Sequence, residues 1–213
     1  MSVEIGLLTE AQTNGATVRQ SRRARRVWLL VLALLIPGHA LAHEAQGALG
    51  GFVSGFTHPI FGYDHLFAML AVGIWGAQMG GGSIWTLPVV FPLIMAVGGF
   101  LGAAGVSLPN VEIMVALSVV GLGLAIALEL KPALLIATLA VGAFAVFHGH
   151  AHGTELPAAA DPITYAVGFV SATGLIHLVG IGFGLLVGSA LNGWVARGAG
   201  VLIVLGGVYF LIT

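Results

Sequence analysis

The chain has 213 residues, of which 58% are hydrophobic and 7% are charged, and its mean hydropathy is +1.06. This composition excludes a soluble globular protein and a disordered one, and with five of the seven basic residues in the first 26 positions the remaining chain offers no basic face for nucleic acid. Cysteine is absent, whereas eight histidines outnumber the lysines and arginines, so we expect an integral membrane protein whose chemistry rests on imidazole.

The first 42 residues have the three parts of a secretory signal peptide. A basic cluster ends at Arg26, an apolar run extends from Val27 to Ile36, and the small residues Ala40-Leu41-Ala42 form a cleavage box. The alternative is an uncleaved first span, but ten strongly apolar residues are short for a bilayer core of about 30 Å. Cleavage after Ala42 would leave His43 as the first residue of the mature chain, which would then be a transmembrane domain over residues 43–213.

Six apolar segments follow, at about 59–79, 84–106, 111–130, 132–151, 161–190 and 194–213. They lack the alternation of barrel strands, so the predicted fold is an all-α bundle of six transmembrane helices. Pro59 and Pro162 are expected at first helical positions, and Gly81-Gly82 and Pro109-Asn110 are expected in turns. Glycines four residues apart predict close helix contacts. The glycines with this spacing are Gly98, Gly102, Gly149, Gly153, Gly180, Gly184 and Gly188.

The predicted orientation follows from the cleaved signal, which leaves the mature amino terminus outside. Alternating helices then put Lys131 and Arg197 inside, and Glu112, Glu155 and Asp161 outside, in agreement with the positive-inside rule. The carboxyl terminus is also expected outside. The signal and the apolar helices together predict a multi-pass protein of the bacterial inner membrane.

The first segment begins with His58 and continues to the pair Asp64-His65. Ionisable residues in a membrane helix cost about 2.5 to 3.5 kcal/mol each on insertion scales, so they need a partner or a function. Both a packing clamp and a metal site fit the pair, and Asp64 suits either a ligand or the acceptor that orients an imidazole. On a regular helix His65 would lie about 10 Å deeper than His58, so the two would be successive sites on a path unless Gly62 opens the turn.

The fourth segment ends with His148, His150, His152 and Glu155. His148, His152 and Glu155 are spaced to share one helix face, as ligands of a divalent ion do, whereas His150 should point about 160° to 200° away. A metal-scavenging tract is the alternative.

Two further polar residues occur in the apolar segments. His177 in the fifth segment is expected near mid-membrane, either bonded to a neighbouring helix or converging with the other histidines. Glu112 at the start of the third segment is expected to attract cations or to cap its helix. Among the ionisable residues near these segments, Glu129 and Lys131 are predicted to form an ion pair without a functional role.

In three motifs the chain resembles the HupE/UreJ family of hydrogenase and urease accessory membrane proteins. The motifs are His58 followed by five residues and Asp64-His65, the block FHGHAHGTE from Phe147 to Glu155, and the block ATGLIHLVG around His177. The resemblance implies uptake of nickel or cobalt into the cytoplasm, with metal handling by His58, Asp64, His65, His148, His152 and Glu155. It also implies a functional link to nickel metalloenzyme maturation proteins.

We therefore predict a secondary permease for a divalent transition metal, not an enzyme, in which His177 lies deeper and His43 and Glu112 lie at the outer end. No tightly bound cofactor is expected besides the transported Ni²⁺ or Co²⁺, and the sequence leaves open whether the chain forms a homo-oligomer. One rival is an intramembrane zinc hydrolase, although HExxH is absent and no serine adjoins the histidines in sequence. The other is a bis-histidine haem carrier, which Asp64 and Glu155 disfavour.

Overall fold

The computed structural model describes residues 48–156, 161–188 and 193–213, and all of its regular structure in those ranges is helical. The predicted all-α fold is therefore confirmed for this part of the chain. The predicted signal peptide, its cleavage site after Ala42 and His43 lie outside the described residues. The helices are α2 (Ala48–Phe61), α3 (Tyr63–Met79), α4 (Ser83–Ala103), α5 (Val111–Ala127), α6 (Leu134–Thr154), α7 (Pro162–Gly188) and α8 (Trp194–Ile212).

Their length and composition fit a multi-pass membrane protein. Helices α4, α6, α7 and α8 are each long and apolar enough to cross a membrane, and α2 and α3 meet the same criterion together as a bent pair. Helix α5 is equally apolar but has 17 residues. At about 1.5 Å per residue its length is about 26 Å, close to the thickness of a bilayer core.

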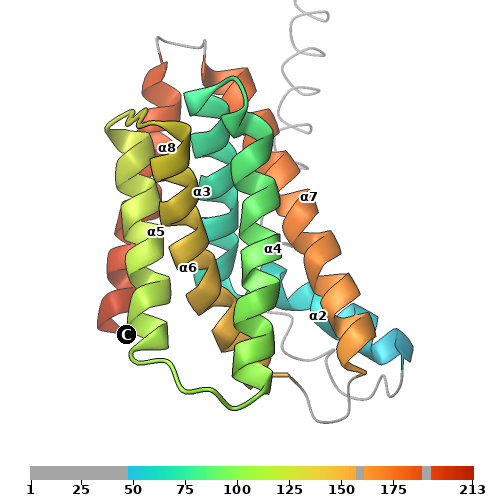
Figure 1. The fold of residues 1–213 in the computed structure, drawn as a ribbon. Coiled ribbons are helices and arrows are strands. Elements are labelled where there is room, and N and C mark those ends of the chain that lie inside the picture. Colours follow the sequence, from blue (N-terminus) through green and yellow to red (C-terminus); the bar gives the residue numbers. More distant parts are fainter. Residues whose placement is uncertain (1–47, 157–160, 189–192) are drawn as a thin grey trace, which may run out of the picture. The chain divides into compact units, whose positions relative to one another are not determined.

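The first predicted segment differs from the structure. Helix α2 begins eleven residues before Pro59, which lies inside this helix and not at its first position. The chain then breaks at Gly62, and α3 continues at an angle of 77° to α2. Figure 1 shows α2 lying across one end of the bundle while α3 runs through its middle. Pro162 does begin α7, where Asp161 Oδ1 accepts a hydrogen bond of 2.8 Å from the backbone N–H of Thr164.

Glycines let several helices pack backbone to backbone. Gly98 and Gly102 of α4 face Gly149 and Gly153 of α6, and a Cβ on any of the four would meet a backbone atom of the opposite helix. Gly180 and Gly184 of α7 lie against α3 in the same way. Gly188, which shares the spacing, has no such neighbour within 4 Å. Close approach matters here because helices in lipid associate through packing and not through the hydrophobic effect.

The two ends of the bundle carry different charges. At one end, where α5 stops and α6 starts, Lys131 pairs with Glu129 at 3.4 Å and Arg197 donates to the carbonyl of Ala127 at 3.1 Å. At the other end lie the start of α5 with Glu112, the end of α6 with Glu155, and α2 (Figure 1). The predicted ion pair of Glu129 and Lys131 is thus present.

Candidate metal centre

The break at Gly62 brings the first histidine motif together. Gly62 has an extended backbone (φ −79°, ψ 96°), although its N–H still donates to the carbonyl of His58 at 2.9 Å. Because α2 turns away there, the rings of His58 and His65 lie with centroids 6.5 Å apart. Of the two arrangements considered from the sequence, the structure has the one in which the chain opens at Gly62, and not the regular helix with His65 about 10 Å deeper.

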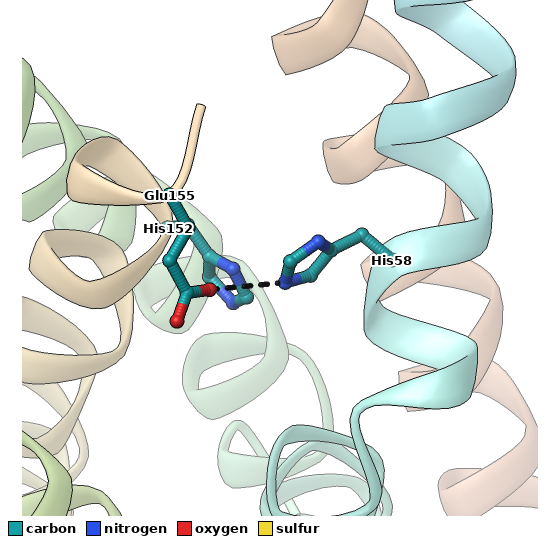
Figure 2. A group of neighbouring side chains, drawn as sticks. All are labelled: His58, His152 and Glu155. Atoms are coloured by element: carbon teal, nitrogen blue, oxygen red, sulfur yellow. Dashed lines mark ion pairs between the residues drawn. The ribbon is translucent and has the colours of Figure 1, made fainter. Parts of the chain in front are cut away.

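Three side chains form a compact set of potential ligands at this end of the bundle. One ligand atom each of His58, His152 and Glu155 lies within 4.8 Å of the other two. Figure 2 shows the two α6 residues and the His58 ring, which comes from α2, pointing toward one another. Glu155 and His58 form an ion pair at 3.4 Å, and contact with this imidazole lowers the pKa of Glu155 below its usual value. A carboxylate and two imidazoles are a donor set that suits a divalent transition metal.

Two more histidines continue from this set into the protein. The ring of His152 lies 4.1 Å from that of His65, whose ring lies 4.7 Å from that of His148. His58 and Glu155 are partly exposed, whereas His152, His65 and His148 are 5%, 6% and 0% exposed. The four rings therefore lead from the surface into the bundle, and His148, His152 and Glu155 share a face of α6 as predicted from their spacing.

Neighbouring acceptors orient two of the buried imidazoles. His65 Nδ1 lies 2.7 Å from Asp64 Oδ1, and because an ionised carboxylate only accepts, Nδ1 carries the proton. His148 Nε2 lies 2.7 Å from the hydroxyl of Ser118, which donates its own proton to the carbonyl of Val115 at 2.6 Å. The hydroxyl must then accept from Nε2–H. His65 Nε2 and His148 Nδ1 are left as buried nitrogens with free lone pairs.

His177 lies deeper and is separated from the other imidazoles by a phenylalanine. The ring of Phe91 lies 5.4 Å from His148 and 5.5 Å from His177. His177 Nδ1 donates to the carbonyl of Pro88 at 3.1 Å. This carbonyl has no partner within its helix because Pro92, four residues later, has no N–H. His177 is 1% exposed and its Nε2 has no partner among the described residues. Of the two alternatives for this residue, the structure shows the bond to a neighbouring helix, and Phe91 separates His177 from His148.

The remaining predicted residues do not join the group. His150 Nε2 donates to the carbonyl of Val106 at 2.6 Å, so this side chain points to the connection between α4 and α5. Glu112 is exposed in the first turn of α5, which fits either of its expected roles. His43 lies outside the described residues. Three residues beside the histidines were not predicted from the sequence: Ser118, Phe91 and Phe169, whose ring lies 4.1 Å from His152. For Ser118, the available signal in the sequence was a serine within an apolar helix.

Comparison with known proteins agrees with these motifs. The sequence matches the family described as HupE / UreJ protein over residues 30–210. The chain belongs to the HupE/UreJ family. It is similar to Protein HupE of Rhizobium leguminosarum bv. viciae, with 41% identity over 187 residues that cover 88% of this chain and 97% of the relative. No solved structure matches the chain significantly.

The hydrolase alternative has one feature in its favour, since Ser118 does contact a histidine. This serine is fully buried and its hydroxyl already donates to the carbonyl of Val115. A nucleophilic serine must instead give its proton to the imidazole and must reach a substrate. In this HupE/UreJ protein Ser118 is thus a hydrogen-bond acceptor that orients His148.

Proposed function

We propose that the protein is a secondary permease that takes up a divalent transition-metal ion, nickel or cobalt, across the bacterial inner membrane. The main support is the meeting of His58 from α2 with His152 and Glu155 from the end of α6, within 4.8 Å. Helices far apart in the sequence contribute one shared set of metal-ligating atoms, next to a line of buried imidazoles. The family resemblance, which implies nickel or cobalt, favours these ions over the others that imidazole and carboxylate can hold.

The ion enters as a hydrated cation at the partly exposed Glu155 and His58, where the carboxylate attracts it and replaces water. It then moves to His152, His65 and His148, which offer free nitrogens, and on to His177 beyond Phe91. Asp64 and Ser118 are positioning residues that set which nitrogen faces the path. Glu112 and His43 are proposed to attract the cation at the outer end. The energy source is not nucleotide hydrolysis by this chain, whose sequence has no Walker motif.

The proposed topology has six crossing helices, α3 to α8, with α2 as a short helix at the outer end. A signal peptide cleaved after Ala42 precedes them. Lys131 and Arg197 then lie at the cytoplasmic end and Glu112, Glu155 and Asp161 at the outer end, as the positive-inside rule requires. Intact-mass measurement of the purified protein tests cleavage by the loss of 42 residues, and a reporter fused after Thr213 should work only if it is of an exported type.

Uptake of radiolabelled nickel and cobalt by cells that express the chain tests the function. We expect uptake with the wild type, loss with His152→Ala and retention with His150→Ala, which removes a histidine from the same helix turn but outside the ligand group. The purified wild type should also bind nickel more tightly than His152→Ala. Uptake no greater than in cells without the protein, or equal uptake by wild type and His152→Ala, would reject the permease. We propose that the imported metal is used in the maturation of nickel enzymes.

A further inference from the structure

At the end of the bundle opposite His58, two side chains of α3 are hydrogen-bonded to the end of α5. Trp75 Nε1 donates to the carbonyl of Leu130 at 2.8 Å, and Gln78 Nε2 donates to the carbonyl of Ile126 at 3.0 Å. The carbonyl of Ile126 also accepts the backbone N–H of Glu129 at 3.1 Å, and Leu130 lies in the connection that follows α5. The two bonds hold the last turn of α3 against α5.

A cavity of about 560 Å³ borders Trp75 at this end. It is walled mainly by apolar side chains of α5 and α6, and it extends to Lys131, whose side chain is 52% exposed. The cavity therefore reaches the surface at the Lys131 end. Its lining includes Leu122, Ala125, Ile136, Ala140 and Phe144. Met69 and Val72, which come between His65 and Trp75 in α3, are fully buried.

Several glycine contacts between helices share one design. In the contact between α4 and α6, a Cβ on Gly98 would meet the carbonyl of Val146, three residues before Gly149, and a Cβ on Gly149 would meet the carbonyl of Met95, three residues before Gly98. The contact between α7 and α3 has the same design. There Gly180 faces the carbonyl of Leu70, three residues before Gly73, and Gly73 faces the carbonyl of His177, three residues before Gly180.

In the contact between α5 and α8, the two helices have equivalent roles. A Cβ on Gly123 would lie 2.8 Å from the backbone nitrogen of Val204, three residues before Gly207. A Cβ on Gly207 would lie 2.8 Å from the backbone nitrogen of Val120, three residues before Gly123. Such reciprocity is what a two-fold axis between α5 and α8 produces. The same axis would exchange α3 with α6 and α4 with α7.

The two halves run in opposite directions. Helices α3 and α7 both run away from the end that carries Asp64, whereas α4 and α6 both run toward it (Figure 1). These directions are the ones expected if segments α3 to α5 and α6 to α8 are inverted repeats, an arrangement that transporters use to open alternately to the two sides. Ala140 stands nine residues before Gly149, as Asp64 stands nine residues before Gly73. The Trp75 cavity, which Ala140 lines, is thus the counterpart of the outer ligand group without its ligands.

We propose that the chain consists of two inverted three-helix repeats and that Trp75 and Gln78 form the inner gate of the path. The structure has this gate closed. Release of the ion requires the two hydrogen bonds to α5 to break, so that the space between His148 or His177 and the apolar cavity opens. The cavity lacks ligands, which suits release and not binding. The role of Trp75 and Gln78 as a gate rests on the proposed function, whereas the repeat and the two hydrogen bonds do not depend on it.

Cysteine labelling tests the gate directly, because the chain has no cysteine of its own. Val72 of α3 is fully buried, and Val72→Cys is to be treated with a membrane-impermeant maleimide in inside-out vesicles. The labelling is compared in three backgrounds: wild type, Trp75→Phe and Gln78→Met. Trp75→Phe keeps an aromatic ring but loses the hydrogen-bond donor. Gln78→Met keeps the length of the side chain but loses the amide. We expect labelling about fivefold faster in either variant, since one lost hydrogen bond shifts an opening equilibrium by about that factor.

Two control positions accompany the test. Lys131→Cys is exposed at the inner end and should label at one rate in all backgrounds, and Ser107→Cys, exposed between α4 and α5, should label only in right-side-out vesicles. An unchanged rate at Val72→Cys in both gate variants would overturn the gate. Nickel uptake by the same variants separates the two proposals, because labelling needs no metal. Uptake with unchanged labelling would reject the gate and keep the permease, and accelerated labelling without uptake in any background would do the reverse.

Discussion

The imidazole of His65 donates from Nδ1 to the carboxylate of Asp64 at 2.7 Å, and this one contact determines which nitrogen faces the other histidines. The carboxylate also accepts the backbone N–H of His65 at 2.8 Å, which fixes its own position. His65 Nε2 is thereby left buried and unpaired beside His148 and His152. A negatively charged acceptor on the far nitrogen also makes the free nitrogen a better ligand.

Replacement of Asp64 by asparagine should therefore reduce transport strongly. The amide keeps the shape but loses the charge, and we expect metal affinity to fall about 10- to 100-fold and uptake to fall at every pH and metal concentration tested. Asp161→Asn is the matched control, because Asp161 caps α7 at the same end of the bundle and asparagine caps as well as aspartate. Nickel uptake and nickel binding by both variants check this prediction, which fails if the two variants behave alike.

Ser118→Ala should weaken metal binding through His148. Without the hydroxyl, Nε2–H of a fully buried imidazole loses its acceptor, and the ring is free to turn or to change tautomer. We expect affinity to drop about tenfold, with little loss for Ser118→Thr, which retains the hydroxyl. Nickel titration of the purified variants measures the effect. Equal binding by Ser118→Ala and wild type would mean that His148 needs no orientation.

The periodicity of α6 predicted that His148, His152 and Glu155 share a face and that His150 does not, because a regular helix carries this geometry in its sequence. The partner of His148 was out of reach of such reasoning, since Ser118 comes from a helix 30 residues earlier and meets it only through packing. The opening at Gly62 was named as an alternative from the sequence, but the direction in which α2 turns was not predicted. Glycine permits the bend, but close contacts of Gly55 and Gly168 between α2 and α7 hold α2 against the bundle.

Gly149→Ala should destabilise the bundle. The added methyl would overlap the carbonyl of Met95, and since both atoms belong to packed helices, α4 and α6 must move apart. Overpacking of this kind costs about 1 to 3 kcal/mol, equivalent to about 2 to 4 °C of melting temperature per kcal/mol for a chain of this size. Gly174→Ala is the control, because nothing lies within 4 Å of its Cβ, and alanine there should be neutral or slightly stabilising. Thermal unfolding in detergent compares them, and equal melting temperatures would refute the packing argument.

The last prediction concerns external pH. An imidazole must be neutral to bind a metal, and a free histidine titrates near ~6.5, so protons compete with metal ions for imidazole ligands. Glu155 behaves differently. Its pKa is lowered by contact with His58, so its folded-state pKa lies below the unfolded value. The ionised carboxylate of Glu155 therefore contributes at pH values above the usual pKa range of glutamate. This contribution is lost only as the pH falls below that range.

It follows that acid inhibits uptake through the histidines while Glu155 is still ionised. We expect uptake at low nickel to fall below about pH 6 and to recover when nickel is raised, as competition requires. Glu155→Gln should lower the affinity at every pH from 5 to 8 without removing the acid inhibition, because the lost carboxylate is not the group that titrates in this range. Uptake curves at two pH values and a series of nickel concentrations measure both effects. If nickel does not restore uptake at pH 5, the protons act on the protein elsewhere, and the histidines are not the sites of competition.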